Sequence, residues 1–270
     1  MRSLLEAIDL YRRLIGIQVR SELAYRTSFL LGVLAQSLNN IAEFAILAMI
    51  LRRFEGIGGW ALREIAFLYG MVSAAFGVMD LIFSAFDPGQ FGLDVRRGTF
   101  DRLLLRPAGI TLQVLGSRFL LRRLGRIAQG AAIFAVAVPR VDWTPLKVAY
   151  LPIVFASIVL FFGALFIIGS TVTFWTIESI EAVNILTYGG SEMMSYPMHI
   201  YGQDLRRFFT YIVPAIFVNY YPALYFLDLP DPLGFPGYAP FLAPLAGIGM
   251  MAAALAFWHY GIRHYASTGS

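Results

Sequence analysis

The feature that most constrains this chain is a set of apolar segments long enough to cross a lipid bilayer. The segment from Tyr150 to Trp175 is the most apolar and carries no charged side chain. A helix needs about 20 predominantly apolar residues to span the hydrocarbon core, and a helical bundle satisfies its backbone hydrogen bonds internally, as lipid demands. With 58% hydrophobic and 14% charged residues, the chain has too little charge to cover a soluble domain. The sequence therefore predicts an all-α membrane protein.

The predicted spans follow an N-terminal amphipathic helix over residues 1–28. In that helix apolar residues recur every three or four positions among charged ones: Leu4, Ile8, Tyr11, Ile15 and Val19. This pattern is typical of a helix that lies in the membrane interface. Five spans are predicted after it, over 29–50, 65–86, 124–143, 150–175 and 239–260. The last one ends in Trp258, His259 and Tyr260, a pattern typical of an interfacial aromatic anchor.

A further span is ambiguous from hydropathy. Residues 178–197 are moderately polar, whereas Phe208 to Leu227 is apolar but contains Pro214 and Pro222. Either segment could be the fifth span of six, and the other would then be a linker or a re-entrant hairpin. Both choices place Asp228 to Gly237 on the same side of the membrane as the loop after the first span.

The distribution of basic residues predicts the orientation. With the N-terminus inside, 14 of the 21 basic residues fall in inner segments, eight of them between residues 96 and 126. An excess of arginine marks cytoplasmic segments, so both termini are predicted to be cytoplasmic.

Several catalytic classes have no support in the sequence. A P-loop needs a lysine after a glycine-rich turn to hold phosphates, but the one lysine of the chain, Lys147, follows Thr144-Pro145-Leu146. His199, His259 and His264 show no spacing typical of a metal site. We therefore expect no enzymatic activity, metal or cofactor in this chain.

The polar loop 87–123 is the most informative segment. Thr99 is expected to cap a short helix with Asp101 in its first turn, and Pro107 is expected to stop that helix. Its apolar residues Phe100, Leu103 and Leu104 lie among arginines, which suits either docking to a soluble partner or lying on anionic lipid. Arg118, Arg122 and Arg126 are expected to form a stripe on one helix, more typical of a membrane anchor than of a ligand site.

Polar residues inside predicted spans are candidates for a translocation path. Because such residues are costly in lipid, they face a cavity or another helix. The candidates are Asn39, Asn40, Glu43, Asp80, Asn184 and Glu192. The alternative interpretation is that they hold the helices together by hydrogen bonds.

The loop sequence from Arg97 to Pro107, between a second span and an arginine-rich third, resembles the permease subunits of type-2 ABC exporters. More narrowly, it is similar to a bacterial subfamily of small six-span permeases. The runs Tyr196 to Tyr201, Val213-Pro214 and Tyr220 to Pro222 also resemble that subfamily.

The resemblance implies a complete architecture and a function. The fifth span is then 178–197, and residues 201–227 form a re-entrant external hairpin. The N-terminal helix is a connecting helix, and the loop carries a coupling helix that docks into the ATPase. The coupling residues implied are Phe91, Arg96, Arg97, Thr99, Phe100, Asp101, Arg102, Leu103 and Leu104.

The resemblance also implies the partners and the location. They are two copies of an ABC ATPase that binds ATP and Mg²⁺, a second permease chain (a copy of this one or a related one), and the lipid of the bacterial inner membrane; no nucleic acid is expected. One alternative is an ion-coupled secondary transporter that uses Glu43 and Asp80, although no inverted repeat supports it. A membrane enzyme acting on lipids is a second alternative, but no catalytic set supports it.

Overall fold

The computed structural model describes residues 2–27, 29–35, 38, 42, 45, 46, 49, 56–176 and 183–266. Within these residues every regular element is helical, and one isolated β-bridge between Ile57 and Trp60 closes a turn. The predicted all-α class is therefore confirmed.

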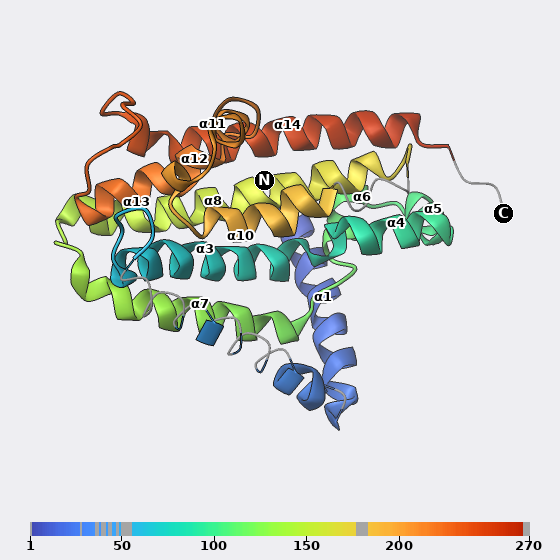
Figure 1. The fold of residues 1–270 in the computed structure, drawn as a ribbon. Coiled ribbons are helices and arrows are strands. Elements are labelled where there is room, and N and C mark those ends of the chain that lie inside the picture. Colours follow the sequence, from blue (N-terminus) through green and yellow to red (C-terminus); the bar gives the residue numbers. More distant parts are fainter. Residues whose placement is uncertain are drawn as a thin grey trace.

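Four helices form the body of the molecule. They are α3 (Leu62–Phe83), α7 (Leu124–Ala137), α8 (Pro145–Val172) and α14 (Ala243–His264). Figure 1 shows them stacked side by side in the order α7, α3, α8, α14, and the closest packing is between successive members of this order. The central position of α3 and α8 explains why most of their side chains are buried.

Glycines allow the helices to pack backbone against backbone. A Cβ atom added to Gly130 of α7 would lie 2.3 Å from the backbone nitrogen of Ala74 in α3, and one added to Gly70 of α3 would lie 2.5 Å from the nitrogen of Phe134. Gly247 of α14 approaches Ser157 of α8 in the same way. Small residues that let backbones approach closely are the main packing device of membrane helices, because hydrophobicity does not drive their association in lipid.

Three described stretches are long and apolar enough to cross a membrane: Leu62–Arg96, Pro145–Val172 and Ala239–His264. They correspond to the predicted spans 65–86, 150–175 and 239–260. In the predicted span 124–143, α7 has 14 residues and is continued by the short helix η3 (Val138–Arg140). A 14-residue helix is about 21 Å long, shorter than the hydrocarbon core of about 30 Å. Ten of the 22 residues in the predicted span 29–50 lie outside the described residues. The count of six spans therefore stays a prediction.

The ambiguous region forms a broken helix pair. In the predicted span 178–197, a π-helix η4 (Ile185–Gly189) leads into α10 (Gly190–Met194). A short helix η5 (Met198–Ile200) precedes α11 (Gln203–Arg207), the π-helix η6 (Phe208–Ile212), α12 (Ala215–Val218) and α13 (Tyr220–Leu227). The stretches Gln203–Ile212 and Ala215–Leu227 meet at 73°, and the break falls at Pro214, which lacks a backbone N–H donor. This geometry fits either one broken span or a re-entrant hairpin.

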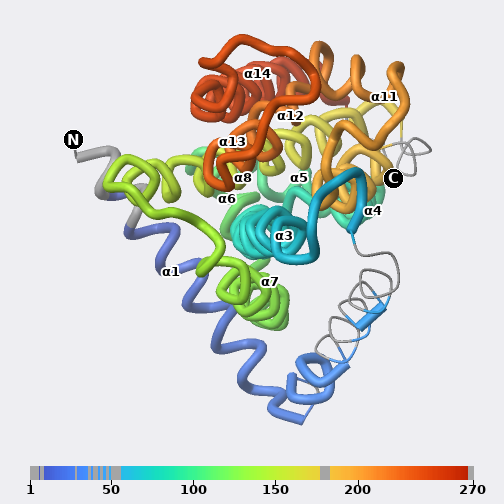
Figure 2. Tube along the Cα trace, turned by 60° about the vertical axis from the view of Figure 1, so that its left-hand side comes forward, coloured from blue at the N-terminus to red at the C-terminus, as the bar shows by residue number. Residues whose placement is uncertain are grey.

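The remaining helices lie at the ends of the bundle. Helix α1 (Arg2–Ala24) crosses the direction of the long helices, on the opposite side of the bundle from α11 (Figures 1 and 2). Helices α4 (Pro88–Arg96), α5 (Thr99–Leu104) and α6 (Ile110–Leu115) lie at one end of the bundle, which we call the arginine-rich end. The 56–61 and 228–238 loops both lie at the other end of the bundle. This position agrees with their predicted place on one side of the membrane, which stays a prediction.

A buried lysine joins the broken helix pair to α8. Thr144 caps α8 by accepting a hydrogen bond from the backbone nitrogen of Lys147 at 3.3 Å. The buried Lys147 Nζ then contacts Asp228 Oδ2 at 2.6 Å and donates to the carbonyl of Phe226 at 3.1 Å. Asp228 ends α13 in a left-handed conformation, with a φ of 52°. No pattern in the sequence predicted this contact.

We predict that Gly130→Ala destabilises the protein, because the added methyl group would collide with the α3 backbone. Overpacking of this kind costs about 1–3 kcal/mol. The matched control is Gly249→Ala in α14, where an added Cβ atom meets nothing within 4 Å. Unfolding in mixed micelles of detergent and SDS measures the stability of both variants. Equal stability of Gly130→Ala and Gly249→Ala would contradict the packing described.

Candidate functional site

The arginine-rich end is built on two short helices joined by a tight turn. Asp87 caps α4 by accepting a hydrogen bond from the backbone nitrogen of Gln90 at 3.0 Å, and Pro88 occupies its first turn. The helix ends at a turn in which Gly98 has a φ of 66°, a conformation that favours glycine. Helix α5 starts directly after Gly98. Asp101 lies in its first turn, as predicted, but Gly98 takes the capping position that was predicted for Thr99.

An aromatic cluster holds these helices against the bundle. It consists of Phe86, Phe91, Phe100, Phe174, Trp258 and Tyr265, with neighbouring ring centroids 5.1–6.2 Å apart. Two hydrogen bonds support it: Trp258 Nε1 donates to Thr111 Oγ1 at 3.0 Å, and the Tyr265 hydroxyl donates to Asp101 Oδ1 at 2.9 Å. The α4–α5 unit is therefore fixed to α14 and to the end of α8.

This cluster corrects two sequence-based expectations. Phe100 was predicted to be an exposed apolar side chain, but it is 1% exposed because it fills the centre of the aromatic cluster. Trp258 was predicted to be an interfacial anchor, but it is fully buried for the same reason. Phe91 is also buried, so neither phenylalanine of the predicted coupling set is available for contact with a partner.

The exposed surface of the α4–α5 unit is basic, with an apolar tip. Its solvent-facing residues are Arg96, Arg97, Arg102, Leu104, Leu105 and Arg106. Leu105, at the end of α5, is 85% exposed, whereas Leu103 packs partly against the core. Arg102 Nη2 donates to Thr99 Oγ1 at 3.4 Å, so Thr99 helps to orient an arginine. We call Arg96, Arg97, Arg102, Leu104 and Leu105 the basic tip.

The three arginines predicted to form one stripe instead make different contacts. Residues 116–120 are not helical and α7 begins at Leu124, so Arg118, Arg122 and Arg126 do not share a helix. Arg118 donates to Gln90 Oε1 and Asp94 Oδ2, both at 2.9 Å, which joins α4 to the loop before α7.

Asp80 is paired with a residue of that loop. Its carboxylate lies at the arginine-rich end of α3 and is 0% exposed, and its Oδ2 atom lies 3.0 Å from Arg123 Nε. Two charges at this distance compensate each other, and a buried carboxylate without such a partner is strongly destabilising. Asp80 is therefore one half of an ion pair, but no hydrogen bond joins its carboxylate to Arg123 Nε. Both interpretations of Asp80, path lining and interhelical hydrogen bonding, stay predictions.

Glu192 is paired with the third arginine. Arg126 Nη2 lies 3.3 Å from Glu192 Oε1, and the same guanidinium stands 4.3 Å above the ring of Phe76. Arg126 thus links α10 to α3 through α7. The Tyr188 hydroxyl makes a parallel link from η4, since it donates to Asp87 Oδ2 at 2.6 Å.

The other path candidates are less informative. Asn184 lies half-buried one residue before η4. Asn39, Asn40 and Glu43 lie outside the described residues. Two of the path candidates, Asp80 and Glu192, are therefore each paired with an arginine, Arg123 and Arg126 respectively. The structure does not test the remaining candidates.

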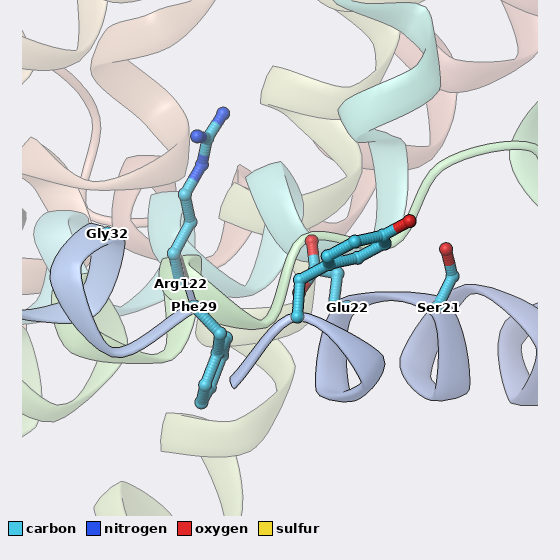
Figure 3. A pocket seen from close by; sticks show the side chains of 6 residues that line it. Ser21, Glu22, Phe29, Gly32 and Arg122 are labelled. Carbon is cyan, nitrogen blue, oxygen red and sulfur yellow. The ribbon is translucent and has the colours of Figure 1, made fainter. Parts of the chain in front are cut away.

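Helix α1 docks onto the loop that carries these arginines. Gln18 Nε2 donates to the carbonyl of Ser117 at 2.8 Å, and Glu22 Oε2 accepts from the backbone nitrogen of Leu121 at 3.0 Å. A pocket of about 300 Å³ lies beside this contact, lined by Ser21, Glu22, Tyr25, Phe29, Gly32 and Arg122. Figure 3 shows the Arg122 side chain on one side of this pocket and Ser21 and Glu22 on the other.

The described part of the chain contains no group of three or more histidine, cysteine, aspartate or glutamate side chains that could hold a metal ion. The contacts at the arginine-rich end can position helices and neutralise charge.

The fold and this end of the bundle define a multi-pass helical membrane protein with a basic surface at one end. The sequence model of one protein family, described as ABC-2 family transporter protein, matches residues 38–269 of the chain. This match covers most of the chain, so the protein belongs to the ABC-2 family of transporter proteins and is a membrane permease of an ABC-type transporter. The family resemblance stated from the sequence is confirmed, and the family implies an ATPase partner. No curated protein and no solved structure matches the chain significantly.

We predict that Arg123→Gln lowers the free energy of unfolding by about 3 kcal/mol, because it leaves the buried Asp80 carboxylate uncompensated. The double variant Asp80→Asn/Arg123→Gln should recover much of that loss. The matched control is Arg122→Gln, since Arg122 is exposed and makes no ion pair with any described residue. Unfolding in mixed micelles measures all three variants, and equal stability of R123Q and R122Q would show that the pair contributes nothing.

Proposed function

We propose that the chain is the permease subunit of an ATP-driven exporter and that the basic tip is its contact with a separate ATPase subunit. The observation that carries this proposal is the α4–α5 unit, which is anchored by buried aromatic rings on one side and presents arginines and two leucines on the other. A rigidly held surface of this kind can transmit a displacement to the bundle.

The contacts supply a route for that displacement. A movement of α4 reaches the loop before α7 through Arg118, because Arg118 bonds both Gln90 and Asp94. The same loop contacts α3 through Arg123, and α7, which follows it directly, contacts α10 through Arg126. In the proposed cycle, ATP and Mg²⁺ bind to two ATPase copies, the two ATPase subunits close, and the basic tips of two permease chains move together. The path between those chains then changes its accessibility.

The remaining parts of the proposal follow from this cycle. The chain hydrolyses no ATP itself, and it pairs with a second copy or a related permease. It lies in the bacterial cytoplasmic membrane with six spans, with the arginine-rich end and both termini on the cytoplasmic side. The ion-coupled alternative uses Glu43 and Asp80. Glu43 lies outside the described residues, and Asp80 has Arg123 as its counterion.

We predict that Leu104→Ser/Leu105→Ser weakens binding of the ATPase at least tenfold, because apolar side chains at the centre of an interface carry much of its free energy. The measurement is copurification from the native host in a mild detergent, with a P-loop protein identified by mass spectrometry, followed by ATPase assays in vesicles. F100S is unsuitable because it would disturb the aromatic cluster.

The control for this experiment is Ile17→Ser/Leu23→Ser, which also replaces two exposed apolar side chains, on α1. It should leave ATPase binding unchanged. Retention of the ATPase by L104S/L105S would refute the basic tip as the contact, and absence of any P-loop protein from the wild-type complex would refute ATP-driven transport.

A further inference from the structure

A second pocket lies on the opposite side of the bundle from α1. Helix α11 and the π-helix η6 form one wall of it, and the 228–238 loop forms the other. The pocket has a volume of about 280 Å³ and is lined by Gln203, Arg206, Arg207, Thr210, Tyr211, Pro232, Leu233 and Phe235. This volume is at the lower end of the range for small-molecule sites, so it fits a head group better than a large ligand.

The helical wall carries the polar groups of the pocket. Gln203, Arg206 or Arg207, and Thr210 or Tyr211 recur at three- or four-residue steps and so share one helix face. The helix widens here into a π-helical turn, closed by a hydrogen bond from the backbone nitrogen of Val213 to the carbonyl of Phe208 at 2.9 Å. Single π-helical turns are frequent at functional sites.

The two arginines of the pocket have no counterion within the described residues. Asp204 follows Gln203 on the same helix. Within the described residues it makes no ion pair with the guanidinium group of either arginine. The nearest acidic residue of the loop, Asp231, turns its carboxylate to its own backbone. Its oxygens accept hydrogen bonds from the nitrogens of Leu233 at 2.8 Å and Phe235 at 2.6 Å. The positive charge of the pocket is therefore available to a ligand.

The donors of the pocket point to a particular anion. Each guanidinium offers several N–H groups in a plane that suits two oxygens at once, and the Gln203 amide adds further donors. This number of donors matches the three or more acceptor oxygens of a phosphate group better than the two of a carboxylate. Pro232, Leu233 and Phe235 give the facing wall an apolar character. Tyr211, which lines the pocket, is 74% exposed.

We infer that this pocket binds the phosphate group of an amphiphilic molecule through Arg206 and Arg207. The phosphate is carried either by a phospholipid head group or by a soluble phosphorylated molecule, and the chemistry at the arginines is the same in both cases. This inference goes beyond ATP-driven transport and does not rest on it, because the binding requires neither nucleotide nor ATPase.

The test uses the full chain purified in a detergent without phosphorus. In the first arm, inorganic phosphate is titrated and its ³¹P resonance is followed for broadening. In the second, the protein is reconstituted into nanodiscs of equal phosphatidylglycerol and phosphatidylcholine, and the lipids that remain bound are identified by native mass spectrometry. The variant is Arg206→Gln/Arg207→Gln, and R206K/R207K retains the charge but loses the planar donors.

The matched control is R12Q/R13Q, which removes the same charge from another adjacent pair of exposed arginines, on α1, that lines none of the described pockets. We expect R206Q/R207Q to weaken binding about tenfold or more, R206K/R207K to weaken it less, and the control to bind as the wild type does. Size-exclusion profiles and thermal unfolding establish that each variant is folded.

The outcomes separate the two sources of phosphate. Arginine-dependent retention of phosphatidylglycerol alone would identify a lipid head group, and arginine-dependent broadening of inorganic phosphate would identify a soluble ligand. The inference is overturned if the wild type binds neither probe, or if folded R206Q/R207Q binds both as the wild type does. Since neither arm contains ATP, such a failure would leave the transport proposal intact.

Discussion

The close contact between α3 and α7 is the constraint on which the rest of the structure depends. At Gly70 and Gly130 the two backbones approach until no side chain fits between them. In lipid such packing replaces the hydrophobic driving force that holds soluble helices together. Because α7 is held so close, the loop that precedes it must run beside the end of α3. That position brings Arg123 to Asp80, and it brings Arg126 over Phe76 and toward Glu192. The charge contacts at this end thus follow from an uncharged contact in the middle of the bundle.

The sequence predicted the positions of the long helices far better than the contacts that their side chains make. The apolar stretches 150–175 and 239–260 appear as Pro145–Val172 and Ala243–His264, because length and apolarity are local properties that a bilayer enforces. The pattern of Phe100, Leu103 and Leu104 is equally compatible with an outward and an inward face. The rings that cover Phe100 come from Phe174 and Trp258, far along the chain, and no local signal predicts that meeting.

The arginines show the same limit. Their number predicted which end of the bundle is basic, but their spacing wrongly predicted a single stripe, since the chain between 116 and 120 is not helical. Arg118, Arg123 and Arg126 each make a specific contact, and Arg122 stays exposed. For the pocket at α11, the adjacent arginines were visible in the sequence. What made them a site was the orientation of Asp231 toward its own backbone, which only the folded loop shows.

The contact of Lys147 has a practical consequence. Its amine is the one lysine side chain in the whole sequence, and it is buried between Asp228 and the carbonyl of Phe226. An amine-selective reagent can reach this side chain only when the end of α13 separates from α8. The rate of that modification therefore reports how often the broken helix pair opens. The measurement needs no substitution in the protein, because Lys147 is the one lysine of the chain.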